Sequence, residues 1–411
     1  MRYFYKEMKD KMKDKILIDS GFDTDFDINQ INEITKIFNY DDLLKKYIEN
    51  LHIESSAYDL KRGEYYPEIL RATKTLKGIV ASKYNIDPSQ VHPNFGSNGS
   101  IDTILTSLLS ASVSKIKNTL SKNNDEKTKL EEIQSIMKAT QALAITPTYF
   151  RNYNSTESKN IKLEKVNILS KDFEFDVPSI IDAIKKSDSQ VVMIVTPNNP
   201  TGVALKENEL YQILDVLRDD QWCMIDRTLV DINNNINTKA LLEKYKHKNI
   251  VLLHSFSKFN SLSHVRIGIA LYSNEEFANQ IKSNLPLGSN FEGLIKASKL
   301  VYENSSIQAD KEIIDNIQKN KTYLYDFFYN YDDIHITNFV SNYALVYWDS
   351  KKFNSTDIVS FMQEKSLYVM DGAEFPERNT KVIRLHTGAE HNLIVKFSLA
   401  LEEFLRNNGI S

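Results

Sequence analysis

The stretch "VVMIVTPNNPTG" (residues 191–202) joins an uninterrupted apolar run to a turn rich in proline and asparagine. Five apolar residues without a polar interruption are typical of a strand buried on both faces, as in a parallel sheet. The prolines, asparagines and glycine that follow form a rigid turn, which ends the strand and presents amide side chains. Taken alone, this turn is equally consistent with an ordinary connection between a strand and a helix.

Short apolar runs of the same kind recur along the chain. They are "ALAI" (142–145), "WCMI" (222–225) and "IVLLHS" (250–255), and helix-length amphipathic stretches separate them. Strands that alternate with helices predict crossover units and an α/β fold, with a mainly parallel sheet covered by helices on both faces. Because ligands bind beyond the carboxyl ends of such strands, the residues to inspect are Tyr149, Asn199, Asp226 and Lys258.

The 411 residues are enough for more than one domain. We expect a large domain over residues 61–300 and a smaller α+β domain over 301–411, where a long amphipathic helix pattern precedes "YALVYWD" and "VIRLHTG". Residues 1–60 have weaker periodicity and are expected to pack on the smaller domain. The charged stretch 114–141 interrupts the sheet pattern, and we interpret it as a solvated helical insertion.

Composition argues against several functions. A net charge of −4 argues against a nucleic-acid-binding surface. Cys223 is the only cysteine, so no disulfide within the chain and no cysteine-based metal site are expected, and its apolar neighbours predict a buried strand position. No apolar run approaches 18 residues, and the first residues lack the apolar region of a signal peptide. We therefore expect a cytoplasmic protein without membrane partners.

Two further segments carry groups suited to binding an anion. "GSNGSIDTILTSLL" (96–109) is a turn of small residues that opens a helix, and free N–H groups at a helix start bind phosphate. Taken alone, the segment is better explained by a plain helix N-cap. "SFSKFNSLSHVRIG" (255–268) places Lys258 among serines, with Arg266 eight residues later. Singly, Lys258 is also consistent with a surface lysine and Asp226 with a helix cap.

In chain order, the glycine turn, Tyr149, "NPTG", Asp226, "SFSK" and "RIG" resemble the aminotransferase class I/II family of fold type I, from about residue 60 to the end. The histidinol-phosphate aminotransferase branch is nearest in layout. The resemblance implies pyridoxal 5′-phosphate as the cofactor. This group needs a lysine for a Schiff base, a carboxylate near its ring nitrogen, and donors for its phosphate and O3′.

The resemblance also implies a role for each position. Lys258 forms the Schiff base (the internal aldimine) and moves a proton between substrate Cα and C4′, while Asp226 holds the proton of the pyridine nitrogen. Asn199 donates to O3′, and Arg384 binds the substrate carboxylate bidentately. The residues implied to bind the phosphate are Ser97, Asn98, Ser255, Ser257 and Arg266.

Two aromatic residues complete the implied site. Tyr149 stacks on the cofactor ring, and Tyr66 in "YYP" reaches the phosphate of the neighbouring subunit, which implies a homodimer. Plain packing of Tyr66 is the alternative.

The chain departs from the family pattern next to Asp226. The family usually has Asp-Glu-Ala-Tyr there, whereas this chain has "DRTL", so Leu229 replaces the tyrosine that donates to O3′. The loss predicts an aldimine with a higher pKa than in relatives that keep the tyrosine. Arg227 replaces an acid, and His264 stands where small residues are usual. His264 is interpreted either as an additional acid/base or as a packing residue.

The function predicted from these features is a pyridoxal-phosphate-dependent aminotransferase that moves an amino group from an amino acid to a 2-keto acid. Its partners would be these small molecules. The departures around O3′ leave open another reaction at Cα or Cβ on the same fold, such as decarboxylation, elimination or cyclisation. A sensor that binds the cofactor without catalysis is a third alternative, and the intact Lys258, Arg266 and Arg384 argue against it.

Overall fold

The structure is a computed structural model that describes residues 16–17, 67–122, 125–167, 172–233, 236–259, 265–285, 290–303 and 311–410. The predictions for Tyr66 and His264 lie outside these residues, and so does most of the N-terminal segment 1–60. One described piece of that segment, strand β1 (Ile16–Leu17), pairs in parallel with β11 (Leu367–Tyr368).

A seven-stranded sheet forms the centre of the fold. Its spatial order is β2-β8-β7-β6-β5-β3-β4. The strands from β7 to β4 run parallel to their neighbours, and β8 is antiparallel to both β7 and β2. The mainly parallel sheet is therefore confirmed. The strands are β2 (Val91–Asn94), β3 (Gln141–Thr146), β4 (Lys162–Asn167), β5 (Val191–Val195), β6 (Trp222–Asp226), β7 (Asn249–Ser255) and β8 (Gly268–Tyr272).

The central strands are apolar throughout because both faces of the sheet are covered. Val192 and Ile194 of β5 belong to one core cluster, whereas Val191 and Met193 belong to the other. This alternation follows from the two-residue period of a strand. Cys223 is buried in β6, as predicted.

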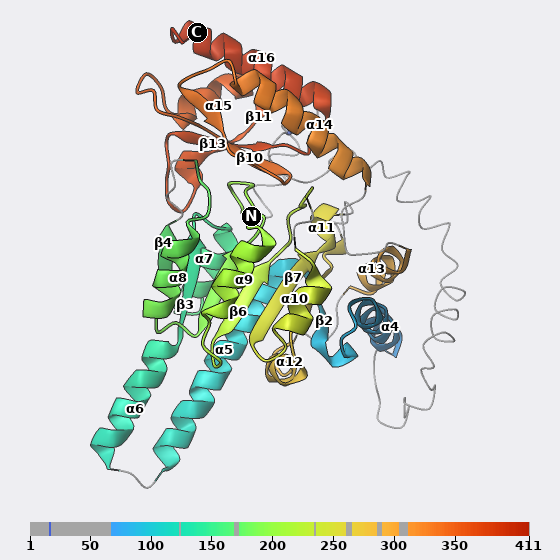
Figure 1. Cartoon of the computed structure of the whole chain (residues 1–411), viewed down its shortest axis with the longest axis vertical. Coiled ribbons are helices and arrows are strands. Elements are labelled where there is room, and N and C mark those ends of the chain that lie inside the picture. Colours follow the sequence, from blue (N-terminus) through green and yellow to red (C-terminus); the bar gives the residue numbers. More distant parts are fainter. Residues whose placement is uncertain are drawn as a thin grey trace.

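Helices cover each face (Figure 1). On one face, α5 (Gly96–Ser121) and α12 (Glu275–Lys282) contribute buried residues to the second cluster. Helix α7 (Phe150–Glu157) packs against α5. Five further helices of this part contribute side chains to the first cluster, namely α4 (Pro67–Tyr84), α8 (Val177–Lys186), α9 (Glu207–Asp215), α10 (Thr238–Lys244) and α13 (Phe291–Glu303).

The stretch 114–141 is mostly a helical hairpin. Residues 114–121 continue α5, and α6 (Glu126–Ala139) packs along that helix, so that the pair projects away from the sheet (Figure 1). Helix α6 buries none of its residues, and Leu120, Leu130 and Met137 are all more than half exposed.

A second sheet has the order β12-β13-β10-β9 and is antiparallel. Its strands are β9 (Ile334–Ile336), β10 (Tyr343–Trp348), β12 (Met370–Asp371) and β13 (Val382–His386). Helices α14 (Lys311–Phe328), α15 (Ser355–Glu364) and α16 (His391–Asn407) cover it. These elements have the α+β character predicted for residues 301–411, and the domain boundaries themselves stay a prediction.

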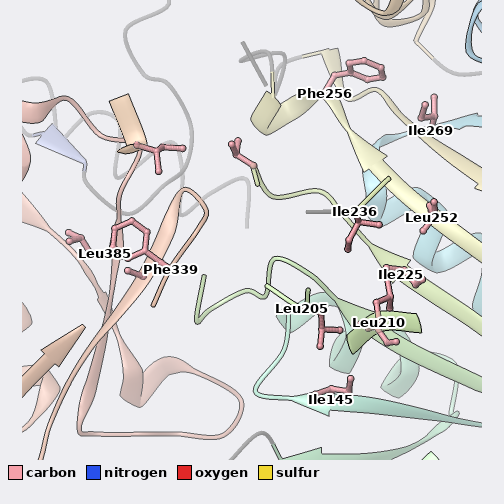
Figure 2. Close-up of a cluster of buried hydrophobic side chains, with 14 of the residues drawn as sticks. Ile145, Leu205, Leu210, Ile225, Ile236, Leu252, Phe256, Ile269, Phe339 and Leu385 are labelled. Carbon is pink, nitrogen blue, oxygen red and sulfur yellow. The ribbon is translucent and has the colours of Figure 1, made fainter. Parts of the chain in front are cut away.

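One apolar cluster contains residues of both sheets. Leu205, Ile225 and Leu252 belong to it on the large-sheet side, and Phe339 and Leu385 on the small-sheet side (Figure 2). Short 3-10 helices lie at η3 (Pro88–Gln90) and η5 (Gly372–Glu374), and the short helix α11 (Phe256–Phe259) directly follows β7. Within the described ranges, no helix combines the length and apolar composition that a membrane span requires.

Candidate active site

A cavity of about 470 Å³ lies at the carboxyl ends of the parallel strands, where the large sheet meets the small one. Every site residue predicted from the sequence, apart from Tyr66, lines this single cavity. They are Ser97, Asn98, Tyr149, Asn199, Asp226, Ser255, Ser257, Lys258, Arg266 and Arg384. Parallel strands bring their carboxyl ends to one edge of the sheet, which explains how segments far apart in sequence meet here.

Asp226 is the buried acid of the cavity. It is the last residue of β6 and is only 3% exposed. Burial raises the pKa of its carboxyl group to about 6, although the backbone N–H of Thr228 donates to Oδ1 at 2.8 Å and opposes the rise. The carboxylate thus lacks sufficient compensation for its charge, and a cationic N–H placed beside it in the cavity would supply that compensation.

The start of α5 forms an anion cradle. The N-cap position is Phe95, whose side chain cannot accept a hydrogen bond from the first N–H groups of the helix. Gly96 has a φ of +70°, and a Cβ at this position would lie 3.2 Å from Arg266 Nη2. The absence of a side chain therefore lets the guanidinium approach the helix start, where the helix dipole also favours a negative charge.

Arg266 and the serines after β7 complete the cradle. Arg266 Nη1 lies 3.4 Å from Ser257 Oγ, and both residues line the cavity together with Ser255. The backbone of Arg266 has a φ of +48°, a left-handed conformation that a residue with a side chain rarely adopts. The strain is consistent with a backbone held to aim the guanidinium.

Lys258 lies in α11, one short helical turn beyond the end of β7. Its Nζ donates to the hydroxyl of Tyr343 at 3.4 Å and lies 5.8 Å from the centroid of the Tyr343 ring. Tyr343 begins β10 in the small sheet, so the lysine lies where the two sheets meet.

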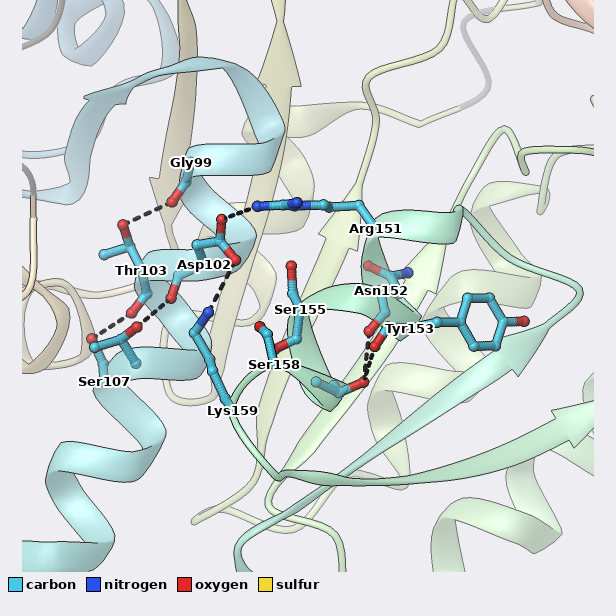
Figure 3. Close-up of polar contacts among 12 residues, drawn as sticks. Gly99, Asp102, Thr103, Ser107, Arg151, Asn152, Tyr153, Ser155, Ser158 and Lys159 are labelled. Atoms are coloured by element: carbon cyan, nitrogen blue, oxygen red, sulfur yellow. Dashed lines mark hydrogen bonds and ion pairs between the residues drawn. The ribbon is translucent and has the colours of Figure 1, made fainter. Parts of the chain in front are cut away.

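Tyr149 contributes an aromatic wall. Burial and the nearby Asp226 carboxylate raise the pKa of its hydroxyl to about 12, and this hydroxyl donates to Asn98 Oδ1 at 3.0 Å. Tyr149 directly precedes α7, which is fixed to α5 by the ion pair between Arg151 and Asp102 at 2.6 Å; Asp102 also pairs at 3.1 Å with Lys159, just after α7 (Figure 3). These ion pairs fix the position of Tyr149 relative to the anion cradle.

The "NPTG" turn links the cavity to the small sheet. Arg384 Nη1 donates to Asn199 Oδ1 at 3.0 Å, which leaves the amide NH₂ of Asn199 as its donor group. Gly202 has a φ of +73°, and a Cβ there would lie 1.9 Å from the carbonyl oxygen of Tyr343. Glycine is therefore required at this position for the turn to contact β10.

The two residues near Asp226 that differ from the family pattern, Leu229 and Arg227, lie in different surroundings. Leu229 lines the cavity and brings no hydrogen-bonding group to it. Arg227 is buried outside the cavity lining, where Nη1 donates to the carbonyl oxygen of Ile236 and to Thr238 Oγ1. The arginine thus binds the segment that leads into α10.

Sequence reasoning missed several lining residues. Phe150, Val195 and Thr228 each lie close in sequence to a predicted site residue, so proximity was the available signal. Tyr343 and Met370 come from the small sheet and had no such signal. Met370 pairs in register with Arg384 across two strands, a neighbour relation that appears only once the sheet is formed.

The cavity offers an anion cradle at the start of α5 and a second arginine, Arg384, on the small sheet, so it suits a phosphate-bearing cofactor together with a carboxylate-bearing substrate. This combination, at the carboxyl edge of a mainly parallel sheet, is the arrangement that the resemblance to fold-type-I enzymes predicts. The family model "Aminotransferase class I and II" matches residues 129–393. The chain belongs to this family, whose members use pyridoxal 5′-phosphate.

Individual relatives agree with the family. The histidinol-phosphate aminotransferase of Sulfurimonas denitrificans is 25% identical over 252 residues, which cover 58% of this chain and 66% of the relative. The crystal structure of the histidinol-phosphate aminotransferase from Clostridium acetobutylicum has a TM-score of 0.68 at 15% identity and covers 95% of this chain and 99% of that one. The L-threonine-O-3-phosphate decarboxylase from Porphyromonas gingivalis has a TM-score of 0.64 at 15% identity, with the same coverage. At these identities the solved structures show the fold.

The residues present fit pyridoxal 5′-phosphate. The buried Asp226 needs a cation beside it, and a protonated pyridine nitrogen is such a cation. Gly96 lets the helix start lie beside two groups that bind phosphate, because a Cβ there would lie 3.2 Å from Arg266 Nη2 and 3.8 Å from Ser255 Oγ. Lys258 lines the same cavity and carries a primary amine, the group that a Schiff base with this cofactor requires.

Proposed function

We propose that this cavity catalyses the transfer of an amino group from an amino acid to a 2-keto acid. The observation that carries the proposal is the convergence of Lys258, Asp226, Arg266 and Arg384 on one cavity. When bound, pyridoxal 5′-phosphate supplies an electron sink for the pair released from a Cα bond. The protein's own residues orient the reactants and move the proton.

The cofactor-binding residues divide between two ends of the cavity. Asp226 would accept a hydrogen bond from the pyridine N–H and keep that proton in place. Arg266, with the backbone N–H groups of Ser97 and Asn98 and the hydroxyls of Ser255 and Ser257, would bind the phosphate. Tyr149 would stack on the ring, and Asn199 would donate from its amide NH₂ to O3′.

Substrate binding and proton transfer fall to Arg384 and Lys258. Arg384 would bind the α-carboxylate with both arms of its guanidinium, and Asn199 orients this side chain by accepting from Nη1. A fixed carboxylate sets which Cα bond is aligned for cleavage. Lys258 Nζ would then take the proton from Cα and hold it for return.

The homodimer is implied by the family resemblance, whereas the location and the domain boundary are proposed from the sequence pattern. A homodimer in which Tyr66 reaches the phosphate of the neighbouring site would complete the cradle. We place the enzyme in the cytoplasm and its domain boundary near residue 300.

The proposal is tested by spectroscopy and product analysis. Purified protein should bind pyridoxal 5′-phosphate with a visible absorbance, and borohydride should fix the cofactor to Lys258, as mass spectrometry of the peptide would show. Pooled L-amino acids should then bleach this absorbance and release 2-keto acids. Release of carbon dioxide, or of ammonia, without lasting conversion of the cofactor to its amine form would favour a decarboxylase or lyase, which the fold of the Porphyromonas gingivalis relative allows.

A further inference from the structure

Tyr343 brings a hydroxyl group to the lysine from an unexpected direction. Lys258 Nζ and the Tyr343 hydroxyl oxygen are 3.4 Å apart, although the residues are 85 positions apart in the chain. Tyr343 is 4% exposed and lines the same cavity as Leu229. The position that usually carries a tyrosine therefore has an apolar side chain, whereas a tyrosine from the small sheet contacts the lysine.

The position of Tyr343 is fixed by its surroundings. Its carbonyl oxygen lies against Gly202, and the N–H of Val340 donates to the carbonyl oxygen of Gly202 at 2.9 Å. On the side of β13, Arg384 Cζ lies 4.3 Å from the centroid of the Tyr343 ring, and the His386 ring centroid lies 5.5 Å away. The ring is thus held by the turn on one side and by β13 on the other.

Two other groups in or near the lining, Tyr149 and His386, have states of their own. The other tyrosine hydroxyl in the described lining, that of Tyr149, donates to Asn98. Burial, together with the positive charges of Lys258 and Arg384, lowers the pKa of His386 to about 3, so this histidine is neutral at physiological pH.

We propose that Tyr343 is a positioning residue for Lys258. From the small sheet, Tyr343 provides a hydroxyl group near the lysine, whereas the large sheet has Leu229 at the position where the family usually has a tyrosine. Its oxygen accepts a hydrogen bond from the protonated lysine nitrogen, and its O–H donates to the nitrogen when that nitrogen is unprotonated. The inference rests on the proposed function, because it assigns a partner to the lysine of that same site.

The test uses the full chain loaded with pyridoxal 5′-phosphate and the variant Y343F. The matched control is Y347F, which removes a tyrosine hydroxyl from the same strand, where it donates to Asp172 at 3.0 Å outside the cavity lining. A third variant, L229Y/Y343F, returns a hydroxyl to the position usual in the family. The readouts are the pH midpoint of the cofactor absorbance and the single-turnover rate with a fixed pool of L-amino acids.

We expect Y343F to shift the absorbance midpoint by about one pH unit or more, because the hydroxyl bonds to the protonated and the unprotonated nitrogen with unequal strength. The single-turnover rate should fall about tenfold, the upper end of what losing one positioning hydrogen bond changes. Y347F should match the wild type, and L229Y/Y343F should return both the absorbance midpoint and the single-turnover rate most of the way to wild-type values. A purely structural role of Tyr343 would leave the midpoint unmoved.

Two different failures can be separated. If the wild type loads the cofactor on Lys258 and releases keto acid, but Y343F has the wild-type midpoint and rate, the Tyr343 inference alone is wrong. If the wild type never fixes the cofactor to Lys258, the proposed function is wrong and the inference falls with it. If Y343F does not show a thermal unfolding transition, L229Y/Y343F is compared with the wild type instead. An absorbance midpoint of L229Y/Y343F that differs from the wild type by one pH unit or more would show that a hydroxyl at position 229 does not replace that of Tyr343, and would refute the inference.

Discussion

Replacing Asp226 with asparagine should stabilise the cofactor-free protein at neutral pH while removing its function. The folded protein raises the pKa of this carboxyl group from 3.8 to about 6 because the group is buried. At about 1.36 kcal/mol per pH unit, this rise amounts to about 3 kcal/mol between the two protonation states.

The direction in which pH changes the stability depends on whether the folded or the unfolded state binds the Asp226 proton more tightly. The folded protein holds the Asp226 proton to a higher pH than the unfolded chain does, so the contribution is fully present below about pH 4 and is lost as pH rises through about 6. Asp226→Asn stays neutral throughout. The difference in unfolding free energy, D226N minus wild type, should therefore increase by about 3 kcal/mol between pH 4 and pH 7.5.

The assay is urea unfolding of the cofactor-free proteins across this pH range, followed by tryptophan fluorescence. Trp222 lies in the same strand as Asp226, and Trp348 lies in the small sheet, so W348F makes the signal specific to the large sheet. Because the other carboxylates titrate in both proteins, only the difference is interpreted. Saturating pyridoxal 5′-phosphate should stabilise the wild type far more than D226N. Parallel stability curves for the two proteins would refute the reasoning.

Three further predictions concern other parts of the site. Lys258→Ala should abolish the cofactor absorbance while the circular dichroism spectrum stays that of the wild type; retention of full turnover would contradict the site assignment. Arg384→Leu should raise KM for amino acids about a hundredfold, as expected for loss of a bidentate carboxylate pair, with an unchanged cofactor Kd as the control measurement. Gly202→Ala should lower the thermal midpoint by several degrees, because its Cβ would lie 1.9 Å from the Tyr343 carbonyl oxygen; an unchanged midpoint would show that β10 moves freely away from the turn.

Much of the large sheet and most of the candidate site could be predicted from the sequence because their signals are local. Each of the strands β3, β5, β6 and β7 appears as a short apolar run, and the polar residue that follows it lies at the sheet edge by the geometry of parallel strands. The serine and glycine segments could be interpreted as anion-binding from a general property alone, because the groups at the start of a helix bind anions. In these places, a short window of sequence determines both the element and its chemistry.

The remainder depended on contacts between distant segments. The antiparallel strand β8 has no periodicity that distinguishes it from its parallel neighbours, and only its pairing with β2 and β7 reveals its direction. Arg227 is adjacent in sequence to Asp226 but points toward the segment before α10. Tyr343 contacts Lys258 because the Gly202 turn brings β10 to the cavity, and none of these residues alone indicates that approach.

The dual attachment of the 196–202 turn has a practical consequence for protein engineering. One residue of the turn holds the guanidinium of Arg384, and another touches the backbone of Tyr343. The turn and the small-sheet residues that it contacts therefore depend on each other for their positions. A chimera that takes the turn from one relative and residues 339–343 from another would change their spacing, so grafts intended to alter specificity should transfer both segments from a single parent.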